Sequence, residues 1–143
     1  MVQQKASSFI KTTVNTRWHI DYSWWDQHTD EDLRTYLLSH LSQEQRESLG
    51  DLSGNHLIDL VDPETGEVTQ ANDLQFALQR AAQQPGFISP HTSLVDGIFR
   101  ALIANGNRPL SANDLSPILS RQAPVILKTL SGTRVYKGIR PTE

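Results

Sequence analysis

The chain has no cysteine and a single methionine in 143 residues. The lack of cysteine excludes a disulfide framework, a thiolate nucleophile and a cysteine-ligated zinc site. No apolar run approaches the roughly 20 residues that span a bilayer, and residues 1–8 lack the charged-then-apolar pattern of a secretory signal. We therefore expect a soluble, cytoplasmic protein with no membrane partner.

The usual signatures of catalysis are also missing. No glycine-rich phosphate loop, nucleophile elbow or pair of carboxylates stands out, so we expect a non-enzymatic protein without a cofactor or a metal. His19, Asp21, Asp26 and His28 could together hold a divalent ion. Their spacing matches no fixed ligand motif, and polar residues on a strand are ordinary. A metal-dependent enzyme around His19 and His28 is therefore the weakest of the alternatives.

Charge is distributed unevenly along the chain. Hydrophobic residues make up 37% and charged residues 20%, which is typical of one globular domain. Residues 1–96 hold six Lys/Arg against fourteen Asp/Glu, whereas residues 97–143 hold seven against two. The two parts carry formal charges of about −8 and +5 on this count. A basic part favours a polyanionic partner; the alternative is that the acidic part neutralises it within the fold.

The first regular pattern is a strict alternation over residues 10–24. Even positions are β-branched or aromatic and odd positions polar, which predicts one long strand, or two joined by a bulge, with one buried face. Trp18, Tyr22 and Trp24 lie on the even face and are expected in the core. Trp25 is out of phase, so we expect it on the surface, where it could contact a partner.

Residues 29–84 predict helices and a hairpin. The expected elements are a helix capped near Thr29, a restart at Ser42–Gln45 that ends at Gly50, a hairpin over 56–69, and a helix from Asn72 to Pro85. His40 and His56 lie beside apolar residues and are expected to be structural.

Three short helices and a strand follow residue 89. Thr92 or Ser93 caps the first helix, whose wide apolar stripe must be buried. Ser111 with Asp114 caps the second, and Pro124 lies in the first turn of the third, which ends at Gly132. Residues 134–140 are then expected to form an extended strand.

This order, in the run RPLSANDLSPILSRQAPVILKTLSGTRVYKGIRP, resembles winged-helix and helix-turn-helix domains over residues 89–140. The resemblance implies that the third helix enters the major groove of DNA. Of its early positions, Gln122, Lys128 and Thr129 can form hydrogen bonds, whereas Ala123 and Val125 cannot.

Two features depart from that family pattern. Pro117 lies inside the second helix, where it removes a backbone hydrogen bond, and the single strand after Gly132 implies a reduced wing. We predict phosphate contacts, thin base readout and a stacking role for the tyrosine, from the following nucleic-acid-binding residues: Arg121, Gln122, Lys128, Thr129, Arg134, Tyr136, Lys137 and Arg140.

The sequence thus predicts an α+β protein in one body. Residues 1–88 form an N-terminal α+β portion of strands, helices and a hairpin, packed with a C-terminal winged-helix-like unit of residues 89–143. The expected function is nucleic-acid binding or regulation through the basic C-terminal face. The alternative is a protein-interaction module or complex subunit with the winged helix as scaffold, its contact made by the acidic portion or by Trp25. A homo-oligomer is also open.

Overall fold

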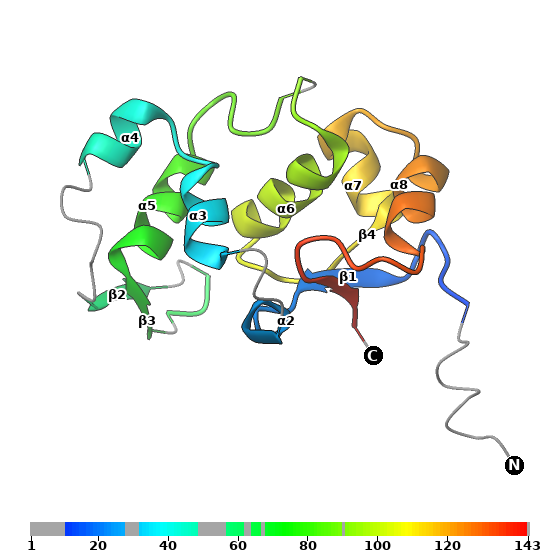
Figure 1. Cartoon of the computed structure of the whole chain (residues 1–143), viewed down its shortest axis with the longest axis horizontal. Helices are drawn as coiled ribbons and strands as arrows, with labels where there is room; N and C mark the ends of the chain where they lie inside the picture. Colours follow the sequence, from blue (N-terminus) through cyan, green and yellow to red (C-terminus); the bar gives the residue numbers. More distant parts are fainter. Residues whose placement is uncertain are drawn as a thin grey trace, which may run out of the picture.

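The three-stranded antiparallel sheet joins the two ends of the chain. The computed structural model describes residues 11–27, 32–48, 57–61, 64–66, 68–89 and 91–142. Strand β1 (Arg17–Ile20) lies between β4 (Leu110–Ser111) and β5 (Ile139–Pro141), and pairs antiparallel with both (Figure 1). Trp18 and Ile20 of β1 are 2% exposed, so a strand of the acidic portion provides the centre of this sheet and part of its core.

Strand β1 is shorter than the alternating pattern predicts. The Asp21 carboxylate accepts hydrogen bonds from the Ser23 backbone N–H (3.1 Å) and hydroxyl (2.6 Å), and the chain turns into helix α2 (Ser23–Gln27). The turn buries both Trp24 (8% exposed) and Trp25 (6%) and leaves Tyr22 38% exposed. The predicted long strand, the exposed Trp25 and the buried Tyr22 are therefore wrong, because a local turn replaces the alternation after Ile20.

The acidic portion otherwise follows its capping signals. Its further elements are α3 (Leu33–Leu38), α4 (Gln43–Ser48), the antiparallel hairpin of β2 (Leu57–Val61) and β3 (Val68–Asn72), and α5 (Asp73–Ala82). Ser42 and Gln45 form the predicted capping box, with bonds of 2.8 and 3.1 Å. Asp32 is the observed cap of α3. The predicted features at Thr29, Gly50 and His56 lie outside the described residues.

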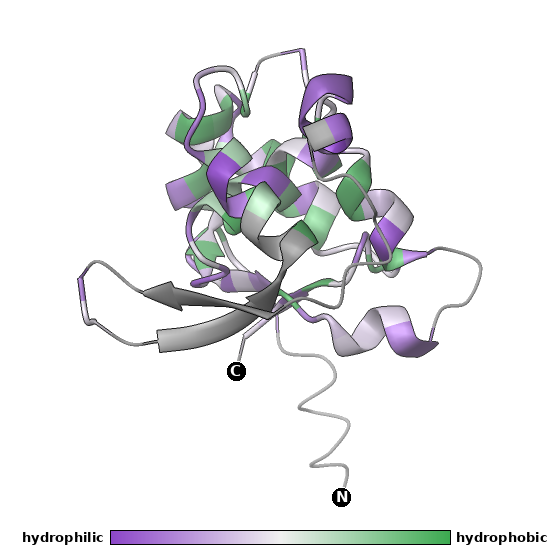
Figure 2. Cartoon of the chain, turned by 90° about the vertical axis from the view of Figure 1, so that its left-hand side faces the viewer, coloured by the Kyte–Doolittle hydropathy of each residue, from purple (hydrophilic) through white to green (hydrophobic). Residues whose placement is uncertain are grey.

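The helices of the C-terminal portion begin where predicted. Helix α6 (Leu94–Ala104) is capped by Ser93, α7 (Ala112–Leu119) by a capping box of Ser111 and Asp114, and α8 (Ala123–Leu130) has Pro124 in its first turn. All three lie on one side of the three-stranded sheet (Figure 1). In Figure 2 the helices carry bands of both hydrophilic and hydrophobic residues, as expected where one face is buried.

The last strand is also shorter than predicted. Only Ile139–Pro141 is extended, and residues 131–138 form an irregular connection from α8 to β5. Lys137 and Gly138 have φ of 54° and 78°, and such left-handed backbone cannot continue a strand. The described chain is thus an α+β fold with seven helices and an open three-stranded sheet, which confirms the predicted class.

Candidate nucleic-acid interface

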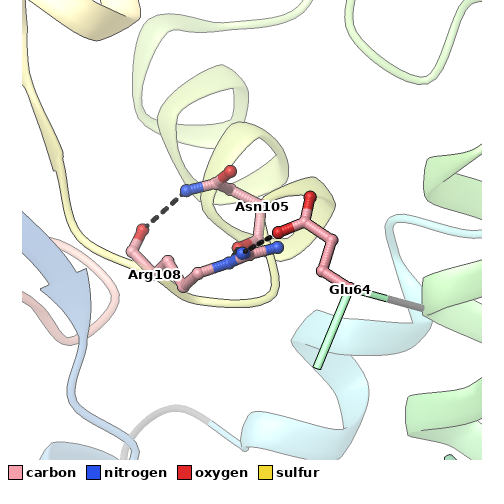
Figure 3. Close-up of polar contacts among 3 residues, drawn as sticks. All are labelled: Glu64, Asn105 and Arg108. Atoms are coloured by element: carbon pink, nitrogen blue, oxygen red, sulfur yellow. Dashed lines mark hydrogen bonds and ion pairs between the residues drawn. The ribbon is translucent and has the colours of Figure 1, made fainter. Parts of the chain in front are cut away.

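Seven cations of the basic portion are candidates for phosphate contacts, but four of them contact side chains of the acidic portion. Arg108 is one of these (Figure 3). Its Nη1 lies 3.5 Å from Oε2 of Glu64, in the turn between β2 and β3, and its Nε donates to the backbone oxygen of Asn105 at 3.2 Å. Both charged side chains are more than half exposed, so the pair is weak. It nevertheless lowers the net charge available at Arg108.

Arg140, a predicted phosphate contact, faces a carboxylate. Its Nη1 lies 3.7 Å from Oδ2 of Asp21, and its side chain remains 50% exposed. The hydrogen bond from the Ser23 hydroxyl, assisted by the Ser23 backbone bond and the charge of Arg140, holds the pKa of Asp21 below its ordinary value against the opposing effect of burial. Asp21 is therefore charged at neutral pH. Its negative charge offsets part of the positive charge of Arg140, whose side chain is still half exposed to solvent.

Lys137, another predicted contact, is folded back onto the acidic portion. Its ammonium lies 4.7 Å from the centroid of the Tyr36 ring on α3, a cation–π geometry. The Tyr36 hydroxyl in turn donates to Asp96 at 2.6 Å. Arg100, the fourth cation, donates from Nε to His40 at 2.9 Å. Lys137, in the connection from α8 to β5, thus contacts α3, and Arg100 of α6 contacts the segment that follows α3.

The other three cations, Arg121, Lys128 and Arg134, have no carboxylate partner within the described part of the chain. Arg121 lies in the turn between α7 and α8, which is fixed by bonds of its backbone to Ser116 and by the left-handed Ser120. Lys128 is exposed in the last turn of α8. Arg134 follows α8 and its guanidinium lies 5.2 Å from the centroid of the Tyr136 ring.

The remaining predicted residues lie on or beside α8. Gln122 is the exposed N-cap residue, and its side chain makes no capping bond. Thr129 and Tyr136 are half-buried. Val125, in the first turn of α8 between Gln122 and Lys128 in sequence, is 46% exposed. Gln122, Lys128 and Thr129 therefore all belong to α8 or its N-cap. Val125 occupies a first-turn position where a helix that reads bases usually has a polar residue.

The sequence reasoning missed Arg17, which lies in the acidic portion but on the sheet. Its partner across the ladder is Ser111 of β4, and its carbonyl accepts the Thr142 backbone N–H at 2.8 Å. Arg17 is exposed, and its position alternates with the buried Trp18. His19 and Arg140 are directly opposite one another on the same outer face of the sheet. The odd positions of the alternating pattern were the available signal.

The metal alternative has no cluster to support it among the described residues: no three His, Asp or Glu side chains there group closely enough to hold an ion. His28, its second proposed ligand, lies outside them. Among the described helices, none has the length and apolar character needed to cross a membrane.

Comparison with known proteins gives no relative. No family model, curated protein or solved structure matches the chain. Functional argument therefore depends on the charges and contacts of this chain alone.

Proposed function

We propose that this protein binds nucleic acid through phosphate contacts made by Arg121, Lys128 and Arg134. The observation that carries the proposal is that these three cations lie along one stretch, from the turn before α8 to the segment after it, without a carboxylate partner in the described chain. The other four cations of the basic portion contact groups of the acidic portion or the backbone. A surface of unmatched cations attracts a polyanion.

The order of helices and strands also supports nucleic-acid binding. Helix α6, strand β4, helices α7 and α8 and strand β5 follow one another as in a winged-helix domain, with β1 taking a place between β4 and β5. In such domains the third helix and its flanks meet the nucleic acid. Gln122, Thr129, Tyr136, Lys137 and Arg140 remain secondary contacts in this proposal, and Arg17 is added as an outer-face cation.

The proposal includes weak sequence discrimination. Val125 is the exposed residue in the first turn of α8, and Pro124 beside it also lacks a hydrogen-bonding side chain. Phosphate contacts position a protein on the duplex but carry no direct sequence information. We expect affinities for two unrelated duplexes of equal length to agree within about threefold.

Fluorescence anisotropy with labelled duplex DNA and RNA over a series of salt concentrations tests the proposal. Three phosphate contacts predict a slope of log K against log salt of about −3 for duplex DNA, and each of Arg121→Gln, Lys128→Gln and Arg134→Gln should reduce its magnitude by about 1. Arg46→Gln is the matched control, because Arg46 is an exposed cation on α4 of the acidic portion. No binding, or equal effects of all four substitutions, would overturn the proposal.

A further inference from the structure

The tip of the helix pair α7–α8 has an unusual surface composition. Among the residues whose side-chain exposure the structure describes, three large hydrophobic residues are substantially exposed, and two of them, Ile118 (43%) and Val125 (46%), lie there. Ile118 is in the last turn of α7 and Val125 in the first turn of α8, on either side of the turn at residues 120–122. Pro117 and Pro124 beside them are exposed as well. Single exposed apolar residues are ordinary, but here four of them flank one short turn, and we refer to these four residues as the apolar patch.

Cations border this patch. Arg121 lies in the turn before α8, four residues before Val125, and Lys128 lies on α8 three residues after Val125, so the exposed Val125 falls between two cations along this part of the chain. Neither cation has a carboxylate partner among the described residues. Asp114, the acid of α7, is held in the capping box at the opposite end of that helix. The first turn of α8 also lacks a side-chain cap, so its positive dipole end is unopposed.

We infer that the tip formed by Pro117, Ile118, Arg121, Pro124, Val125 and Lys128 docks a segment of a partner protein in which apolar side chains alternate with carboxylates. The apolar side chains of that segment cover Ile118 and Val125, and its carboxylates face Arg121 and Lys128. A second copy docking through its own tip would bring like charges together, which disfavours self-association through this patch. This inference goes beyond the proposed function, because it rests on the exposed apolar side chains of Ile118 and Val125, which make no contribution to phosphate binding.

The test uses the full chain and two fluorescein-labelled peptides as probes, one in which leucine alternates with glutamate along the sequence, and a twin with lysine in place of glutamate. Fluorescence anisotropy should detect binding of the glutamate peptide only. Double substitution Ile118→Asn with Val125→Asn should weaken that binding by about tenfold or more. Tyr22→Asn is the matched control, because Tyr22 is the third exposed large hydrophobic residue and lies away from α7 and α8 in sequence, before α2.

Separate outcomes distinguish this inference from the proposed function. The double variant should retain duplex affinity within about twofold, since its cations are intact, and nuclear magnetic resonance shifts caused by the glutamate peptide should map to Ile118 and Val125. Binding of neither peptide, equal binding of both, or shifts confined to other residues would overturn the docking inference and leave nucleic-acid binding unaffected. Loss of duplex affinity in the double variant with unchanged peptide binding would assign the tip to nucleic acid instead.

Discussion

The side chain of Arg100 on α6 donates a hydrogen bond from Nε to Nδ1 of His40, at 2.9 Å. Because Nδ1 accepts, neutral His40 carries its proton on Nε2, which is buried without a hydrogen-bond partner. The imidazole also stacks on Phe99 at a centroid distance of 5.2 Å, and it is 5% exposed. A second proton on this ring would place an imidazolium against a guanidinium, so the folded state holds His40 neutral.

The first prediction concerns acid stability. Burial, together with the charges of Arg100 and Lys137, lowers the pKa of His40 from 6.5 to about 4, against an opposing effect of Asp96. The unfolded chain therefore binds more protons than the folded one between these values. The stability from neutral His40 is complete above about pH 6.5 and is lost as the pH falls toward 4. We expect a loss on the order of 2 to 3 kcal/mol across this window, measured by urea unfolding.

Substitution His40→Gln isolates this effect from the titration of carboxylates. A glutamine oxygen can still accept from Arg100, but the side chain does not titrate. The variant is expected to be less stable than the wild type at neutral pH, because the aromatic stack with Phe99 is lost, and to lose less of its stability on acidification. Parallel plots of unfolding free energy against pH for the two proteins would contradict the role assigned to His40.

The second prediction separates the two lysines of the basic portion. Lys137 lies over Tyr36, whereas Lys128 is exposed in the last turn of α8. Lys137→Met should therefore lower the unfolding free energy by about 0.5 to 1 kcal/mol and change duplex affinity little. Lys128→Gln should leave stability almost unchanged and weaken duplex binding. Urea unfolding and anisotropy on both variants check this; a larger affinity loss in Lys137→Met than in Lys128→Gln would make Lys137 a primary phosphate contact and not a secondary one.

The local starts of the C-terminal helices could be predicted from sequence. Ser93, the Ser111–Asp114 box and Pro124 act within a single turn, so neighbouring residues decide them. Sheet order could not be predicted, because the partner of Trp18 in β4 is Leu110, far along the chain. Nor could the burial of Trp25, which depends on the hydrogen bonds from Ser23 to Asp21 that begin α2 early.

The same distinction applies to the candidate interface. Lysine and arginine content identifies cations, but their partners come from elements distant in sequence. Glu64 reaches Arg108 from the hairpin turn, and Tyr36 reaches Lys137 from α3. The position of Lys137 further requires left-handed backbone at a residue other than glycine, which the extended strand predicted for residues 134–140 does not include. Sequence therefore overestimates the number of cations available to a ligand.

The third prediction concerns Gly138, where β5 approaches the start of α2. Its φ is +78°, and a Cβ added there would lie 2.8 Å from the backbone oxygen of Asp21 and 3.1 Å from Nε1 of Trp25. The Gly138 carbonyl accepts the Asp21 N–H at 2.8 Å, so the two backbones cannot easily separate. Gly138→Ala should reduce the unfolding free energy by about 3 kcal/mol, through strain and steric overlap together.

Gly66→Ala provides the matched control for this substitution. Gly66 has a similar φ of +73°, but nothing lies within 4 Å of an added Cβ. We expect that variant to lose only the conformational part, about 1 kcal/mol. The difference between the two losses measures the overlap at Asp21, and equal losses would show that β5 can move away from α2 without penalty.

The fourth prediction concerns Asn107, which lies just before β4 begins and continues the pairing along β1. Its Oδ1 accepts the Ile20 N–H at 2.8 Å and its Nδ2 donates to the Ile20 carbonyl at 2.9 Å. One side-chain amide thus makes both bonds that a neighbouring strand residue would make, on the side of β1 where backbone pairing stops at Leu110. Asn107 also has φ of 58°, a left-handed conformation that asparagine tolerates better than most residues.

Two substitutions separate these contributions. Asn107→Ala removes both hydrogen bonds and retains the strained backbone, so the unfolding free energy should fall by about 2 to 3 kcal/mol. Asn107→Gly removes the same bonds but accommodates the left-handed backbone, so its loss should be smaller by about 1 kcal/mol. Urea unfolding of the two variants measures the contribution of the hydrogen bonds and that of the left-handed backbone separately. If both variants were as stable as the wild type, Ile20 would be satisfied without the amide, and the end of β1 would not depend on Asn107.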